Sequence, residues 1–422
     1  MKLGISFVTL WALMFCSIQF NFLDLPVKVN GQKGSEDYVV RKMEAAAGLR
    51  QDTKGGFMIY SAQFVDDYGY AYRPNPGWQA IGLYYFVKLT GTSVASTVEI
   101  FNTIYSVLLS LSISLFIFLL FWAFGLFPAL LSAISFLFST PLIFLGANLY
   151  WCIFISMGMV GVIWFMLQSK DSFSPEKLKH LYLVQMALIF LKSMTGYEWI
   201  TFVTLNAFVP VTYFAYVYRE RWTVYFSTIF KLWVASIFGF MAALSIHILQ
   251  GLYAYGSFSE AFGPIIARAV AHSHGGAAIA KKFHAINPAH FKGDMSLGIM
   301  LEHYFSAPIL HTPEWLGAFS VNTKSAVIAM FAAYLSMHLV SKFCIGINSG
   351  TLRKVNGIFF ATIVALLSAL SWVVLAKNHS QYHIFINIIL FCFIFMPMLA
   401  ATIALCFRTL FAEIVRKMKV DI

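Results

Sequence analysis

The stretch VEIFNTIYSVLLSLSISLFIFLLFW, residues 98–122, carries a single charged side chain, Glu99, close to its beginning. A helix that crosses a bilayer needs about 20 mostly apolar residues, because no water is present to solvate polar groups. This stretch therefore predicts a transmembrane helix.

Nine other segments have the same character. Together with 98–122 they predict an all-α polytopic membrane protein of about ten helices, a single membrane domain over residues 1–422. The first segment also resembles a signal peptide with Lys2 in its basic region, but no A-x-A cleavage site follows, which favours a retained helix. The nine segments are 4–22, 125–146, 150–168, 181–196, 199–217, 224–250, 324–345, 356–376 and 383–407.

The composition supports this class. Hydrophobic residues make up 59% of the chain and charged residues 11%, against about 25% charged in a typical soluble domain. The net charge of +11 is explained by basic residues at the cytosolic face and by attraction to anionic lipid, so no nucleic-acid partner is expected. The five cysteines form no CxxC pair, and no nucleotide-binding or metalloprotease motif appears in a supportive context.

Lysines and arginines predict the orientation of the helices. Cytosolic loops are enriched in these residues, and twelve of them gather on one side if the N-terminus is cytosolic, whereas the short connections of the other side carry Lys192 and Lys377. Both termini are then cytosolic, and two long loops, 23–97 and 251–323, lie on the outer face. The twelve are Lys170, Lys177, Lys179, Arg219, Arg221, Lys342, Arg353, Lys354, Arg408, Arg416, Lys417 and Lys419.

The first long loop contains Gln63-Phe-Val-Asp-Asp-Tyr-Gly-Tyr70, in which Asp66 and Asp67 are adjacent among aromatic residues. A partly desolvated carboxylate above a membrane is suited to act as a general base toward a hydroxyl group. The same pair is suited to hold a divalent cation such as Mg²⁺ or Mn²⁺. The alternative is an ordinary Asp-rich turn.

The segment after the acidic pair, residues 73–91, has apolar residues at helical spacing from Trp78 to Leu89. This pattern predicts a short amphipathic helix in the membrane interface. Arg73 precedes it and is a candidate phosphate ligand, because a guanidinium offers a planar fork of donors. Tyr84 and Tyr85 are further candidates for substrate binding, and interfacial anchoring is the alternative role for these aromatic residues.

Three other places carry candidate substrate-binding residues. Glu198, in Thr195-Gly-Tyr-Glu-Trp199, lies where an outer turn joins two spans. An ionisable residue at membrane depth costs free energy, and it is therefore a candidate functional residue. The loop 251–323 is basic and predicts a cationic surface for a phosphate group; its pair His272-Ser-His274 is only a weak metal motif. The remaining candidates are Arg268, Lys281 and Lys282 in that loop, and Lys377, His379 and His383 in the last outer connection.

On these residues the chain resembles the GT-C superfamily of integral-membrane glycosyltransferases, such as protein O-mannosyltransferases and the aminoarabinose transferase of lipid A. The resemblance lies in the layout and in Asp66-Asp67, and also in Asn75-Pro76 to Leu83-Tyr84-Tyr85, which is similar to the family's His-Pro-Pro-Leu-Tyr-Tyr stretch although Asn75 replaces His. Glu198 and the Lys-Asn-His-Ser segment from Lys377 are also similar to bacterial members.

The resemblance implies an inverting enzyme of the cell envelope, in a bacterial cytoplasmic membrane. Its donor would be a polyprenyl phosphate carrying one sugar, and its acceptor a membrane lipid or surface glycan. One aspartate of the pair would take the acceptor proton, while basic outer residues stabilise the lipid phosphate. Two alternatives stay open: an O-antigen-type polymerase or ligase that uses the loop 251–323, and a lipid or polysaccharide transporter, against which the scarcity of charges in the spans counts.

Overall fold

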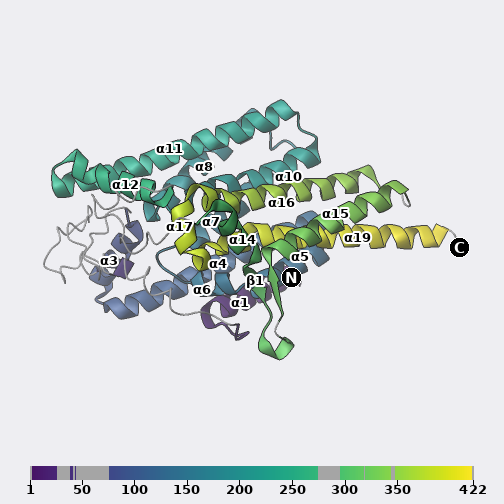
Figure 1. The fold of residues 1–422 in the computed structure, drawn as a ribbon, viewed down its shortest axis with the longest axis horizontal. Coiled ribbons are helices and arrows are strands. Elements are labelled where there is room, and N and C mark those ends of the chain that lie inside the picture. The colour runs from purple at the N-terminus through teal and green to yellow at the C-terminus, as the bar shows by residue number, and fades with distance from the viewer. Residues whose placement is uncertain are drawn as a thin grey trace.

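The computed structural model describes residues 2–25, 39–40, 43, 76–273, 295–317, 319–343 and 347–420. Most of these residues are helical, and the longer helices run roughly along one direction of the molecule (Figure 1). Helices α3, α12 and α17 lie at one end of this bundle, which we call the α17 end, and the C-terminus lies at the opposite end. The helices are α1 (Lys2–Phe20), α3 (Trp78–Thr90), α4 (Val94–Phe124), α5 (Leu126–Leu137), α6 (Thr140–Leu145), α7 (Ile153–Met166), α8 (Pro175–Thr195), α9 (Ile200–Asn206), α10 (Phe208–Tyr218), α11 (Trp222–Tyr255), α12 (Phe258–Ser273), α14 (Leu297–Ser306), α15 (Thr323–Phe343), α16 (Ser349–Leu375), α17 (Lys377–Tyr382), α18 (Ile384–Asn387) and α19 (Met396–Val420), with a π-helical turn at Phe391–Phe395.

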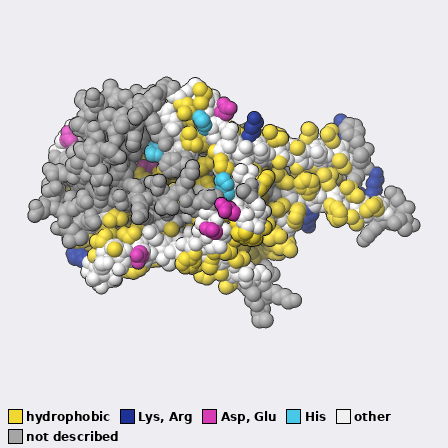
Figure 2. Space-filling model, turned by 60° about the horizontal axis from the view of Figure 1, so that its bottom comes forward, with side chains coloured by type: hydrophobic (Ala, Val, Ile, Leu, Met, Phe, Trp, Pro, Cys, Tyr) yellow, Lys and Arg dark blue, Asp and Glu magenta, His cyan; other side chains and the backbone are white. Residues whose placement is uncertain are grey.

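Six helical segments of the described chain are long and apolar enough to cross a membrane. Hydrophobic side chains cover much of the described surface on the face drawn in Figure 2. On α11, Phe226, Phe230 and Phe238 are exposed as well. In water such a surface would be unfavourable, whereas lipid tails solvate it. The chain is thus an integral membrane protein. The six segments are Val94–Phe124, Ile200–Tyr218, Trp222–Tyr253, Thr323–Lys342, Ser349–Leu375 and Phe391–Met418.

The other four predicted spans are shorter, interrupted or more polar, so the count of ten stays a prediction. The predicted segment 125–146 is broken into α5 and α6 at Phe138–Ser139. Pro141 has no N–H to continue the helical hydrogen bonds, which explains the interruption. Helix α1 has 19 residues, α7 has 14, and α8 has 21 but a more polar composition.

Close packing holds the bundle together. Trp164 of α7 is fully buried, and its ring stacks on Tyr213 of α10 with centroids 5.1 Å apart. Helix α11 lies so close to α8 that a Cβ atom at Gly239 would be 2.3 Å from the carbonyl oxygen of Met186. The contact between α8 and α11 therefore requires glycine at residue 239.

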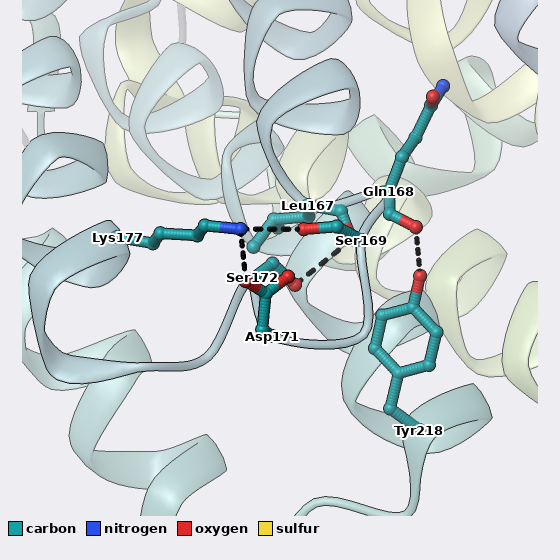
Figure 3. A network of polar contacts seen from close by, with 7 residues as sticks. All are labelled: Leu167, Gln168, Ser169, Asp171, Ser172, Lys177 and Tyr218. Carbon is teal, nitrogen blue, oxygen red and sulfur yellow. Dashed lines mark hydrogen bonds and ion pairs between the residues drawn. The ribbon is translucent and has the colours of Figure 1, made fainter.

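Polar side chains order the connection between α7 and α8 (Figure 3). The Lys177 ammonium donates to Asp171 Oδ2 at 2.5 Å and to Ser169 Oγ at 3.2 Å, while Tyr218 donates to the carbonyl of Gln168. The hydrogen bond from Lys177 is the main cause that lowers the pKa of Asp171. This connection belongs to the side of the membrane that the sequence predicts to be cytosolic.

The loop 251–323 contains strands in addition to the expected short helices. After α14, strand β1 (Pro308–His311) pairs antiparallel with β2 (Ser320–Asn322), and a 3₁₀ turn at Glu314–Leu316 lies between them. The hairpin leads directly into α15 at Thr323. The hairpin was not predicted from the sequence, because strands of three or four residues give too short a pattern to detect.

Candidate active site

Several of the predicted site residues lie outside the described part of the chain. These are Asp66, Asp67, Arg73, Lys281 and Lys282. Arg268 lies on α12, but its side chain is outside the description. The roles of these six residues therefore stay predictions.

Glu198 lies on the turn between α8 and α9. Two residues of this turn have unusual backbone angles, Gly196 with φ 159° and Trp199 with φ 63°, and they allow the chain to reverse within a few residues. The Glu198 side chain is only 6% exposed, and its Oε1 atom accepts a hydrogen bond from Tyr150 Oη at 2.5 Å. Two short connections that the sequence places on the outer face, 146–150 and 195–199, therefore meet.

Lys192 lies below the same turn, in the last turn of α8. Lys192 was predicted to belong to an outer connection, but it is 1% exposed. Its Nζ atom donates to the carbonyl of Gly196 at 3.1 Å, and its charge attracts that of Glu198. A buried ammonium needs such compensation, because the loss of hydration is costly.

A second hydrogen bond connects this turn with α11. Tyr197 Oη lies 2.9 Å from Nδ1 of His247, and His247 is fully buried. Burial, together with the charge of Glu198, raises the pKa of Tyr197, so the phenol stays protonated and can donate to the imidazole. His247 was not predicted as a site residue, although an ionisable residue inside an apolar span is itself a signal.

A third link connects the turn with the 377–383 segment. The Trp199 indole donates to Asn387 Oδ1 at 2.8 Å, and Asn387 Nδ2 lies 3.4 Å from His379 Nδ1. His379 was expected at the lipid headgroup level, but it is 6% exposed, with its ring 4.7 Å from that of His383. The structure thus brings together two predicted site segments that are far apart in the sequence.

We call this group the Glu198 network and define it as Tyr150, Lys192, Tyr197, Glu198, Trp199, His247, His379 and Asn387. Its members come from α8, α11, α17, α18 and the short connections. Sequence reasoning identified Glu198 and His379 but missed Tyr150, Tyr197 and Asn387 as partners, since an aromatic or amide residue between spans gives no distinctive pattern.

The helix predicted within residues 73–91 is α3 (Trp78–Thr90), and its interfacial position stays a prediction. Gln79 Nε2 donates to the carbonyl of Thr195 at 3.0 Å, so α3 is attached to the turn that carries Glu198. Tyr84 and Tyr85 lie further along α3, with their rings 5.1 Å apart, and Lys88 Nζ lies 5.9 Å from the Tyr84 ring. Their binding role stays a prediction.

The remaining predicted residues, Lys377 and His383, are partly exposed at the same end of the bundle. Within the described ranges, no three histidine, cysteine or acidic residues are grouped closely enough to hold a metal ion. Asp66 and Asp67, the predicted ligands of a divalent cation, lie outside those ranges. The residues of the Glu198 network offer hydrogen bonding and charge stabilisation.

Comparisons with known proteins give little guidance. No protein family model matches the chain, and no curated protein matches its sequence. Among solved structures, the oligosaccharyltransferase AglB from Archaeoglobus fulgidus, in complex with an inhibitory peptide and a dolichol-phosphate, aligns with 99% of this chain at a TM-score of 0.45 and 12% sequence identity. This chain covers 52% of that one, so it spans about half the length of its structural neighbour, and a likeness at this level shows neither family nor activity.

Proposed function

We propose that the chain is a membrane glycosyltransferase. It moves one sugar from a polyprenyl-phosphate donor to a lipid-linked or surface-glycan acceptor at the outer face of the membrane. The observation that supports this proposal best is the Glu198 network, in which buried ionisable groups from distant segments meet at the α17 end. Buried ionisable groups are costly in a membrane protein, and they commonly mark the place where a polar substrate is handled.

The reaction proposed is a direct displacement with inversion. The acceptor hydroxyl oxygen attacks the anomeric carbon, and the bond from this carbon to the phosphate oxygen breaks. Asp66 or Asp67 takes the hydroxyl proton as general base. The lipid phosphate leaves with both bonding electrons, and cationic groups stabilise the charge that it gains.

The leading candidates for stabilising the phosphate in this proposal are Arg73, Lys377, His379 and His383. The secondary candidates are Arg268, Lys281 and Lys282. His379 is attached through Asn387 to the turn that carries Glu198. A carboxylate such as Glu198 accepts hydrogen bonds from sugar hydroxyl groups, so we assign it to binding of the donor sugar. The predicted outward position of the site fits a donor that has been flipped across the bilayer.

Single substitutions of the acidic pair test the proposal. Asn at the true base should lower turnover by roughly two to four orders of magnitude, because general-base catalysis is lost while the side chain keeps its size. The readout is the profile of cell-surface glycolipids at equal protein level. Asp52→Asn, in the same long loop, is the matched control and should leave the profile unchanged.

Unchanged profiles for both Asp66→Asn and Asp67→Asn would refute the proposed base. That result would favour the polymerase or ligase alternative, which relies on the basic loop 251–323. A loss of protein in place of activity would show a structural role for the pair.

A further inference from the structure

The hairpin before α15 exposes an unusual set of side chains. Residues Trp315, Leu316 and Phe319, between its strands, are 68%, 53% and 64% exposed. They lie in and after the short 3₁₀ turn Glu314–Leu316 that joins the strands, rather than on the face of a long helix. We call these three residues the hairpin tip.

The base of the hairpin is fixed to the bundle. Ile309 of β1 is fully buried, and its carbonyl oxygen lies 3.7 Å from the Cys392 sulfur. The backbone N–H of His311 donates to the carbonyl of Phe138 at 3.0 Å. The hairpin therefore holds its tip in a defined direction.

This direction is sideways. Figure 1 shows the hairpin projecting from the flank of the bundle, across the direction of the long helices, and not from the α17 end. Its attachment at Phe138 lies thirteen residues along the chain from the turn at Gly125, which is about 20 Å at the helical rise of 1.5 Å per residue. The long helices are the ones able to cross the membrane, so a projection across their direction, away from the turn at Gly125, extends along the membrane.

The backbone of the hairpin is largely satisfied by its own groups. Thr312 N donates to the carbonyl of Phe319 at 2.9 Å, and Phe319 N donates back to Thr312 Oγ1 at 2.9 Å. Within the turn, Gly317 N donates to the carbonyl of Glu314 at 3.0 Å. Internal pairing of this kind is what a segment needs in contact with lipid, where no water replaces a missing partner.

The composition of the tip indicates its depth. Glu314 is exposed beside Trp315, and a carboxylate at the bilayer centre would be costly. Tryptophan is enriched at the membrane–water interface, where aromatic, apolar and charged groups occur together. The tip thus fits the interface better than the hydrocarbon centre.

We infer that this hairpin is an interfacial anchor whose tip inserts into the outer leaflet of the bilayer. The partner is the lipid surface itself, at the level of the glycerol groups and the upper acyl chains. The anchor is independent of sugar transfer, and it fixes the start of α15 relative to the membrane surface.

Fluorescence of a cysteine-linked probe in liposomes tests this anchor. Leu316→Cys is labelled with a nitrobenzoxadiazole dye in the full chain, reconstituted in phosphatidylcholine with phosphatidylglycerol, and the signal of the unsubstituted chain is subtracted. Phe331→Cys, on the exposed face of α15, is the lipid-facing control, and Lys170→Cys, exposed on the α7–α8 connection, is the aqueous control.

We expect the probe at residue 316 to emit at shorter wavelength than the probe at 170 and to resist quenching by iodide. Spin labels near the lipid glycerol should quench it at least twofold more than labels deep in the acyl chains, with the reverse order at residue 331. Adding Trp315→Ser and Phe319→Ser should restore iodide access.

Two results would overturn the inference. One is a probe at 316 that behaves like the probe at 170, as a site for a soluble partner would in the isolated chain. The other is protection from iodide that disappears when the protein is diluted in lipid, which would assign the tip to contact between two copies.

Discussion

At the scale of single residues, the pair Lys192 and Glu198 makes a sharp prediction. Glu198→Gln keeps an acceptor for Tyr150 but removes the charge that offsets the buried Lys192 ammonium. Removing the negative charge near a buried ammonium leaves that ammonium less compensated, so the thermal midpoint of the detergent-solubilised protein should fall. Adding Lys192→Met should recover most of the loss, since no buried charge is then left.

Glu99→Gln is the control for this pair, because Glu99 is exposed on α4 and should leave the midpoint unchanged. If the double variant were less stable than Glu198→Gln alone, the two charges would not compensate each other. Assays of sugar transfer on the double variant then separate stability from binding.

The sequence predicted part of the Glu198 network. It identified Glu198 and His379 because ionisable groups stand out against apolar segments. It did not predict that Trp199 and Asn387 connect them. Trp199 is far from His379 in the sequence, and Asn387, eight residues from His379, lies on another helix. Only the fold brings these residues together. It also placed His379 and Lys192 in water, since short connections are usually exposed, whereas here they fold back into the bundle.

At the scale of elements, the contact between α8 and α11 depends on one glycine. Gly239→Ala would place a Cβ atom 2.3 Å from the carbonyl oxygen of Met186, so the helices would have to separate. Overpacking of this kind costs about 1–3 kcal/mol, and heated samples should lose monodispersity at a lower temperature. Gly161→Ala is the matched control, because its new Cβ would be 3.9 Å from the nearest atom, Leu115 Cδ2; equal behaviour of both variants would contradict the close contact.

The elements also show what hydropathy can predict. Long apolar runs such as Val94–Phe124 and Ser349–Leu375 were predicted because burial in lipid requires them. The break between α5 and α6 was not, because an average over apolar residues ignores the missing N–H of Pro141. The hairpin β1–β2 was missed for a different reason, since its strands pair with each other only after the chain has turned at Glu314–Leu316.

At the scale of the whole molecule, the predicted orientation determines which end of the bundle meets the outside. Ser257, between α11 and α12, is expected on the outer face, and Ser169, on the α7–α8 connection, is expected in the cytosol. In intact cells a membrane-impermeant maleimide should label Ser257→Cys, and it should label Ser169→Cys only after permeabilisation. Labelling of Ser257→Cys from the cytosolic side alone would show that the orientation is the reverse of the predicted one. A lipid donor flipped to the outer leaflet could then not bind at this end of the bundle.

The central claim concerns what leaves the donor lipid. Transfer of one sugar from a polyprenyl phosphate releases one lipid monophosphate for each sugar moved, whereas a polymerase or ligase acting on a pyrophosphate-linked glycan releases a pyrophosphate. The direct measurement is mass spectrometry of the lipids after turnover by the purified chain in liposomes, supplied with polyprenyl-phosphate sugars and an extract of outer-surface acceptors. We predict polyprenyl monophosphate in a one-to-one ratio with transferred sugar, abolished in the Asp66→Asn or the Asp67→Asn variant; release of polyprenyl pyrophosphate, or monophosphate formation that neither variant reduces, would contradict the account.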